Sequence, residues 1–316
     1  MLCVEARSLS KSYGDVVAVD SVDLVVEPGK IFGFLGPNGA GKTTTIKLLT
    51  TLIAPSSGTI KILGTDALKD PLGARRRVGV VLQQPSYEPN LTVEKALDKY
   101  GMMWNVDGGT RKRRVEELLT AFDLKDIRKK KNDDISIGQR RRVQVAREFM
   151  HEMDLLFLDE PTVGLDPSAR RALLDYIKGR VRGGLTIFFT THILEEAEYL
   201  CDEIAIINRG RIVAIDTPDE LRKKFGRKKT IKVHVEGVRD LSGVLRDVGP
   251  HDVSYDGGTV ITLHSADSER ALVRILQVLS SNNIEVEDLS VVPTSLEEIF
   301  LKVVRDSEGQ GDASGI

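Results

Sequence analysis

A glycine-rich segment, Gly36 to Thr44, constrains this 316-residue chain more than any other feature. It matches the pattern G-x-x-x-x-G-K-[ST], and it lies between an apolar run, Ile31–Leu35, and a helix-like stretch, Thr45–Leu49. A strand, a glycine loop and a helix in this order form a phosphate-binding loop, or P-loop. The glycines let backbone N–H groups converge on an anion, and the helix N-terminus adds partial positive charge.

The side chains of this loop predict how a nucleotide is bound. We expect Lys42 to reach the outer phosphates and the Thr43 hydroxyl to ligate Mg²⁺. The predicted nucleotide-binding residues of the loop are Gly36, Pro37, Asn38, Gly39, Ala40, Gly41, Lys42, Thr43 and Thr44.

A second segment suits the same chemistry. The apolar run Leu155–Leu158 is followed by Asp159 and Glu160. A strand that ends in an acid is expected to place Asp159 beside the metal held by Thr43. Glu160 projects differently and could polarise a water aligned with the terminal phosphate. By itself Glu160 could equally be a surface acid at a strand end, but a P-loop in the same chain favours the catalytic interpretation.

The composition is that of a globular protein and gives no sign of a nucleic-acid-binding, membrane-spanning or secreted chain. Hydrophobic residues make up 41% and charged residues 29%, and the net charge of -2 is not that of a strongly basic nucleic-acid-binding domain. No run approaches the length of a membrane span, and the first residues lack a signal pattern. Cys3 and Cys201 form no metal or redox motif and fit a reducing compartment.

The order of apolar runs predicts two domains. Residues 2–222 indicate an α/β domain, with continuous apolar strands and a helical subdomain at about 90–150. A basic linker is predicted at 223–229. Residues 230–305 alternate in the order βαββαβ, which is typical of a small ferredoxin-like α+β domain. Its first helix is expected at 241–248. Residues 306–316 are expected to be a disordered tail.

Several further motifs follow in order along the chain. Ile135-Ser136-Ile137-Gly138-Gln139 stands directly before a predicted helix, and Thr162–Asp166 follows the second acidic segment. Thr190-Thr191-His192 ends the next strand, Gln83 ends an earlier one, and Tyr13 precedes the P-loop. Together with the P-loop, these motifs over residues 2 to about 220 resemble the ATP-binding subunit of an ABC transporter. The implied fold class is a P-loop NTPase domain of the ABC type.

This resemblance implies roles for single residues. Tyr13 would stack on adenine, Gln83 would contact Mg²⁺ or the attacking water, and His192 would hydrogen-bond the γ-phosphate. Asp166 would lie at the seam of a dimer. Each residue also has a simpler interpretation: a core aromatic for Tyr13, a polar loop residue for Gln83, a structural histidine for His192 and an exposed loop acid for Asp166.

The segment at 135–139 departs from the family's usual Leu-Ser-Gly-Gly-Gln signature. Ile135 and Ile137 replace a leucine and a glycine, while Ser136, Gly138 and Gln139 match. The resemblance implies that Ser136, Ile137, Gly138 and Gln139 bind the γ-phosphate of a nucleotide held by the opposite subunit. Ile137 loses the freedom to take a positive φ but keeps its N–H donor. We expect a competent site; a degenerate one is the alternative.

The C-terminal segment Pro293–Leu301 resembles that of ATPases from exporters of the daunorubicin-resistance type. The resemblance implies an ATPase that uses ATP and Mg²⁺, forms a homodimer or heterodimer, and powers a separate integral-membrane permease. The implied system is an exporter of drugs or other hydrophobic compounds. It would be cytoplasmic, on the inner face of the cell membrane through that permease, with no nucleic acid expected. The alternatives are an importer ATPase, a soluble ATPase acting on nucleic acid or ribosomes, and a non-hydrolysing regulatory binder.

Overall fold

The computed structural model describes residues 1–84, 86–226, 229–236, 252–255, 260–265, 267–292 and 295–311. It divides into two compact units, Met1–Thr217 and Pro218–Ile316. The first unit therefore ends earlier than the boundary after residue 222 that the sequence suggested. Within the described part of the chain, no helix combines the length and the apolar character needed to cross a membrane.

The first unit contains two β-sheets. An antiparallel sheet has the order β2-β1-β4-β5, formed by Val16–Val26, Val4–Tyr13, Ser57–Ile62 and Thr65–Asp66. A six-stranded sheet has the order β10-β9-β3-β8-β7-β6, formed by Arg211–Asp216, Glu203–Asn208, Ile31–Leu35, Thr186–Thr191, Leu155–Asp159 and Val78–Val81. All its neighbouring strands are parallel except β10, which pairs antiparallel with β9. The sequence did not separate these two sheets.

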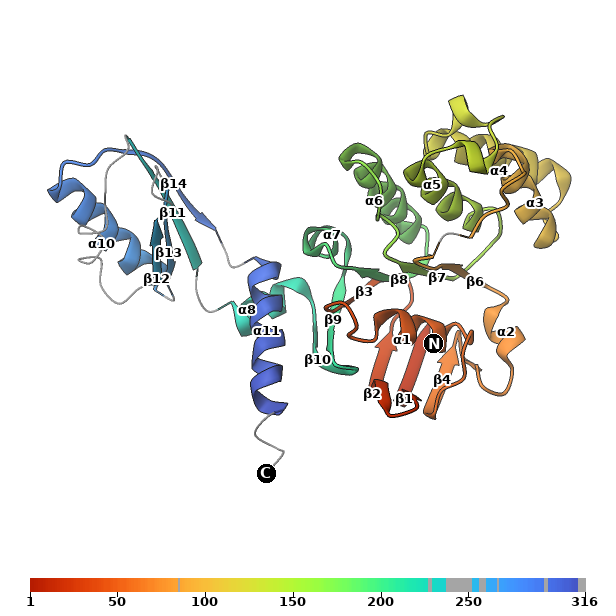
Figure 1. Cartoon of the computed structure of the whole chain (residues 1–316), viewed down its shortest axis with the longest axis horizontal. Coiled ribbons are helices and arrows are strands. Elements are labelled where there is room, and N and C mark those ends of the chain that lie inside the picture. Colours follow the sequence, from red (N-terminus) through yellow and green to blue (C-terminus); the bar gives the residue numbers. More distant parts are fainter. Residues whose placement is uncertain are drawn as a thin grey trace. The chain divides into compact units, whose positions relative to one another are not determined.

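The core of this unit lies around helix α1, Lys42–Leu49. Figure 1 shows α1 between the antiparallel sheet and strand β3 of the larger sheet. Phe32, Phe157 and Phe188 come from three parallel strands and pack ring to ring. Strands β3, β7 and β8 are buried along their whole length, as expected for a parallel sheet covered on both faces. This packing fixes the start of α1 and the ends of the strands relative to each other.

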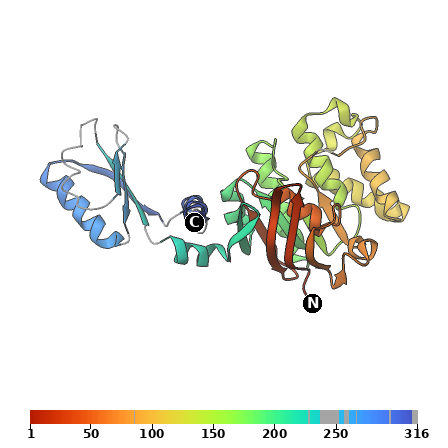
Figure 2. The same ribbon diagram turned by 60° about the horizontal axis from the view of Figure 1, so that its bottom comes forward.

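The helices between β6 and β7 form a group of their own. These are α3 (Val93–Met103), α4 (Gly108–Ala121) and α5 (Ile137–Glu148), with short 3₁₀ turns at Lys125–Ile127 and Asn132–Asp134. Both views show them gathered beside the sheets (Figure 1 and Figure 2). The remaining helices of the unit are α2 (Pro71–Arg75), α6 (Pro167–Arg182) and α7 (Leu194–Leu200).

The second unit has its own sheet and core. Its antiparallel strands have the order β12-β13-β11-β14, formed by Asp252–Tyr255, Val260–Ser265, Lys229–Val235 and Val286–Val292. Strand β13 lies between β11 and β12, which is the split arrangement of a ferredoxin-like domain. Helix α10, Ser268–Ser281, packs through Ala271, Ile275 and Leu279 on this sheet. The helix expected at 241–248 lies outside the described residues.

Two predictions about the ends of this unit need correction. The basic segment is not a plain linker, because Lys223–Phe225 complete helix α8, Pro218–Phe225, where ion pairs one turn apart join Arg222 to Asp219 and Lys223 to Glu220. The C-terminal helix α11, Leu296–Gly311, continues into the predicted tail. Adding residues to a helix that has already formed costs little free energy. The charged composition of residues 306–311 alone did not indicate that the helix continues there.

Candidate functional site

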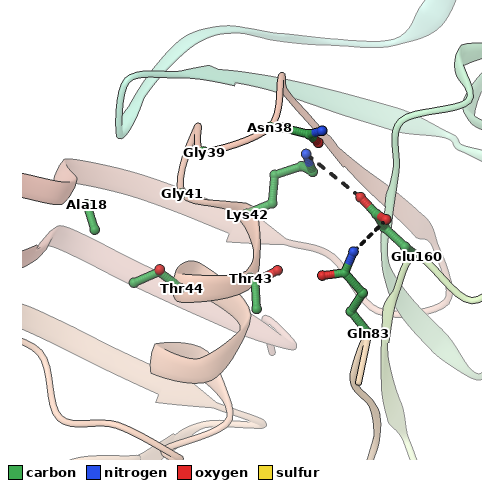
Figure 3. Close-up of a pocket in the computed structure, with 9 residues that line it drawn as sticks. All are labelled: Ala18, Asn38, Gly39, Gly41, Lys42, Thr43, Thr44, Gln83 and Glu160. Atoms are coloured by element: carbon green, nitrogen blue, oxygen red, sulfur yellow. Dashed lines mark hydrogen bonds and ion pairs between the residues drawn. The ribbon is translucent and has the colours of Figure 1, made fainter. Parts of the chain in front are cut away.

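The P-loop lines a pocket of about 330 Å³ at the start of α1. Loop residues Asn38, Gly39, Gly41, Lys42, Thr43 and Thr44 share this pocket with Ala18, Gln83 and Glu160 (Figure 3). Gly41 caps the helix with φ 108°, and a Cβ there would lie 2.5 Å from the carbonyl oxygen of Ala18. Only glycine fits this position, because it combines a left-handed backbone with a close backbone contact.

The Lys42 side chain is buried against the P-loop. Its Nζ donates to the carbonyl oxygens of Gly36 at 2.7 Å and Pro37 at 3.2 Å, and it lies 4.0 Å from Oε1 of Glu160. Burial lowers the pKa of the Lys42 ammonium, while Glu160 and Asp159 act in the opposite direction. Because Lys42 lines the pocket, its ammonium can bind an anion there in place of the loop carbonyls.

Thr43 and Asp159 meet across the two motifs that the sequence connected. The Thr43 hydroxyl donates to Oδ2 of Asp159 at 2.9 Å, and the Thr190 hydroxyl donates to Oδ1 at 2.6 Å. Asp159 ends β7, and Thr190 lies on the neighbouring strand β8, so parallel pairing places their side chains together. The sequence motifs predicted no separate role for Thr190. Its place near the end of a strand next to the acidic one was the signal available.

The Glu160 carboxylate is the centre of the site. Gln83 Nε2 donates to Oε2 of Glu160 at 3.0 Å, and Nδ1 of His192 lies 3.4 Å from the same oxygen. Figure 3 shows Gln83 and Lys42 pointing toward this carboxylate from two sides. Glu160 is buried, whereas the His192 side chain is 51% exposed and borders solvent. An acid held by an amide and a lysine beside a phosphate loop can orient and polarise a water molecule.

Two parts of the chain match known protein families. Residues 19–163 match the ABC transporter family, and residues 217–304 match the family described as ATP-binding protein DrrA1-3-like, C-terminal domain. A daunorubicin resistance ATP-binding protein of Streptomyces coeruleorubidus is 34% identical over 96% of both chains. The chain belongs to the ABC transporter family. It is an ATP-binding subunit that hydrolyses ATP, as the sequence predicted.

Two further proteins agree with this assignment. A daunorubicin/doxorubicin resistance ATP-binding protein of Streptomyces peucetius is 37% identical over 94% of this chain and 91% of its own. A solved structure titled as the ATP binding subunit of an ABC transporter is 33% identical, with a TM-score of 0.66, and covers 71% of this chain and 93% of that one. The predicted fold class is confirmed.

Other predicted residues of the ATPase lie outside the pocket. Tyr13 is half exposed on β1, where Lys11 Nζ lies 5.2 Å from its ring centroid. Asp166 is the N-cap of α6, and the backbone N–H of Ala169 donates to its carboxylate at 2.9 Å. That bond is the main cause of the lowered pKa of Asp166. The Asp-Pro pair at 166–167 was a recognisable helix-start signal.

The signature segment forms the first turn of α5. Ser136 Oγ accepts from the Gln139 N–H at 3.1 Å, and Gln139 Oε1 accepts from the Ser136 N–H at 3.0 Å, which completes a capping box. Ile137 is already helical, so its backbone needs no positive φ, and its side chain is 69% exposed. A Cβ at Gly138 would lie 2.6 Å from the carbonyl oxygen of Gly164, which explains the glycine there.

Arg141 is a residue of this site that the sequence did not reveal. It lies on α5, is 5% exposed, and donates to the backbone carbonyls of Asp159 and Glu160 at 2.6 and 2.8 Å. Burial lowers the pKa of Arg141 to about 10, so the side chain stays charged at neutral pH. No local sequence pattern predicts that Arg141 is buried, because its hydrogen-bond partners come from distant parts of the chain.

Proposed function

We propose that this ATPase powers export of drugs or other hydrophobic compounds through a separate integral-membrane permease. The observation that supports the export function is the near full-length similarity to drug-resistance ATP-binding proteins, including the C-terminal unit. The observation that supports the catalytic mechanism is the placement of Glu160 among Lys42, Gln83 and His192. The importer and nucleic-acid alternatives receive no support from these relatives.

The roles of the pocket residues follow from their contacts. When ATP binds, Lys42 replaces its hydrogen bonds to the loop carbonyls with bonds to the outer phosphates. The loop N–H groups donate to the oxygens of these phosphates as well. Glu160 orients the attacking water, Gln83 fixes the Glu160 carboxylate, and His192 hydrogen-bonds the γ-phosphate at the exposed edge. Tyr13 stacks on adenine. The reaction is phosphoryl transfer to water, achieved by positioning and electrostatics.

Mg²⁺ fits the oxygen donors at the base of the pocket. A hydroxyl and one carboxylate, Thr43 and Asp159, already lie in contact, and Mg²⁺ is commonly held by one or two carboxylates together with nucleotide phosphates. Gln83 can contribute its amide oxygen. The cation, when bound, would neutralise charge that develops on the phosphates.

The second half of the site comes from another subunit. Ser136, Ile137, Gly138 and Gln139 would close over the nucleotide of the partner in a homodimer or heterodimer, with Asp166 at the seam. The dimer would lie on the inner face of the cell membrane, attached through the permease.

Replacing Glu160 by glutamine tests the catalytic role. We expect Glu160→Gln to lower kcat by about a hundredfold or more while ATP still binds, because the amide cannot accept a proton from water. The measurement is phosphate release under saturating Mg²⁺ and ATP, with ATP binding measured separately. Equal rates in the variant and the wild type would exclude Glu160 as the base.

Purification from membranes tests the coupling to a permease. A tagged chain, extracted in mild detergent with its native host membranes, should bring down a multi-spanning membrane protein. Recovery of ribosomes or nucleic acid without such a protein would instead exclude the transport function.

A further inference from the structure

The Arg141 guanidinium connects two segments of the catalytic centre, the turn at Asp159–Pro161 and the strand end before Gln83. Its Nη2 donates to the carbonyls of Asp159 at 2.6 Å and Glu160 at 2.8 Å, and its Nε donates to that of Pro161 at 3.2 Å. Its Nη1 donates to the carbonyl of Leu82 at 2.6 Å. Leu82 directly precedes Gln83, so one buried cation binds the backbone on both sides of the Gln83–Glu160 hydrogen bond.

The backbone at Glu160 needs such support. Glu160 has φ 48°, a left-handed conformation that is unfavourable for a residue with a Cβ. Conformations of this kind persist where the surroundings fix them from several directions. Here the Glu160 N–H donates to the Thr190 backbone oxygen and hydroxyl, both at 3.1 Å, while its carbonyl accepts from Arg141. The turn that aims the Glu160 side chain is therefore fixed from both of its peptide groups.

Other residues of α5 bind the loop that contains Gln83. Gln144 Oε1 accepts from Arg141 Nη1 at 2.8 Å, and Gln144 Nε2 donates to the carbonyls of Leu82 and Gln84 at 3.3 and 3.2 Å. One turn later, Arg147 Nη1 donates to the Ser86 carbonyl at 2.6 Å. These side chains lie three residues apart in sequence and so share one face of the helix. The same helix begins with the signature segment.

We propose that Arg141 is a positioning residue for ATP hydrolysis, because it fixes the Glu160 turn and the Gln83 loop in one arrangement and ties both to the signature helix. It does not touch the substrate. A planar fork with five donors can serve several carbonyls at once, whereas a lysine ammonium is a single compact donor group. Lysine at position 141 should therefore keep the positive charge but should not hold the Glu160 turn and the Gln83 loop together. This inference rests on the catalytic role proposed for Glu160.

The test compares Arg141→Lys with the wild type in single-turnover hydrolysis and in ATP binding by the full chain. We expect the rate of hydrolysis to fall about ten- to a hundredfold, because small misplacement of a catalytic group has effects of this size. ATP affinity should change by less than about threefold, since none of the P-loop contacts described above involves Arg141. A matched control is Arg128→Lys, which alters an arginine of the helical group that bonds Glu94 and Glu116. That variant should hydrolyse ATP at the wild-type rate.

A double-mutant cycle separates positioning from general loss of stability. If Arg141 acts through Glu160, Arg141→Lys should change the residual rate of Glu160→Gln by less than about threefold, although it is costly in the wild type. Equal effects in the two backgrounds, or a wild-type rate for Arg141→Lys, would overturn the proposal. A fully active Glu160→Gln variant would instead remove the proposed role of Glu160 itself.

A milder variant covers the case in which Arg141→Lys does not fold. Gln144→Met keeps the length of the side chain but removes the oxygen that Arg141 Nη1 contacts and the donor to Leu82 and Gln84. We expect a several-fold lower hydrolysis rate with ATP affinity retained. An unchanged rate in this folded variant would contradict the proposal.

Discussion

At the scale of residues, burial controls the charge of a histidine beside the helical group. His151 is buried and its ring stacks on that of Trp104, with centroids 3.9 Å apart and planes 1° apart. Burial, with a smaller effect of the Arg114 charge, lowers the pKa of His151 to about 4. The folded chain therefore binds fewer protons than the unfolded chain between pH 6.5 and 4, and stability is lost as the pH falls through this range.

Replacing this histidine should reduce the dependence on pH. As the pH falls from 7.5 to 5, protonation of His151 in the unfolded chain should lower the free energy of unfolding by about 2 kcal/mol. His151→Phe should lack this decrease, because phenylalanine does not titrate. Phenylalanine can keep the stacking on Trp104. Urea unfolding of both proteins at the two pH values checks this. An equal loss of stability in the two proteins would show that His151 is not the group responsible.

At the scale of elements, helices α5 and α4 begin with similar N-caps, but only α5 belongs to the proposed nucleotide site. Ser136 caps α5 through the Gln139 N–H, and Asp107 caps α4 through the Thr110 N–H at 2.9 Å. Removing either cap should cost about 1 kcal/mol. Only Ser136 belongs to the signature segment that is proposed to reach the partner's nucleotide.

The two alanine variants should therefore differ in activity. Ser136→Ala and Asp107→Ala should show similar losses in thermal stability, while only Ser136→Ala should lower ATP hydrolysis, by about tenfold or more, because it removes a donor to the transferred phosphate. Calorimetry and phosphate release at saturating ATP provide the two measurements. Comparable hydrolysis in both variants would limit Ser136 to a capping function.

Local sequence signals predicted those elements whose structure is decided locally. The strand before Gly36, the helix that follows Ser136 and the acid after Leu158 each depend on a few neighbouring residues. Arg141 was beyond such reasoning because its acceptors come from residues 82 and 159–161, which only the folded chain brings together. The continuation of α11 past residue 305 was missed because composition suggested disorder where a helix simply extends.

At the scale of the whole molecule, each unit has its own hydrophobic core. Leu155, at the start of β7, belongs to the core around α1, and Leu263, on β13, belongs to the core under α10. Both leucines are completely buried. The residues lining the nucleotide pocket all come from the first unit. Binding of ATP should therefore stabilise the first unit and should not require the core of the second.

Matched leucine-to-alanine variants test this division. Each should cost about 2–5 kcal/mol through the cavity it creates. Leu155→Ala should lower the calorimetric transition that ATP raises, because a ligand stabilises the unit that binds it. Leu263→Ala should lower a different transition and leave ATP hydrolysis by the isolated protein within about twofold of the wild type, since distant independent sites act additively. If Leu263→Ala instead abolished hydrolysis or lowered the ATP-dependent transition, the nucleotide site would depend on the C-terminal unit for its integrity.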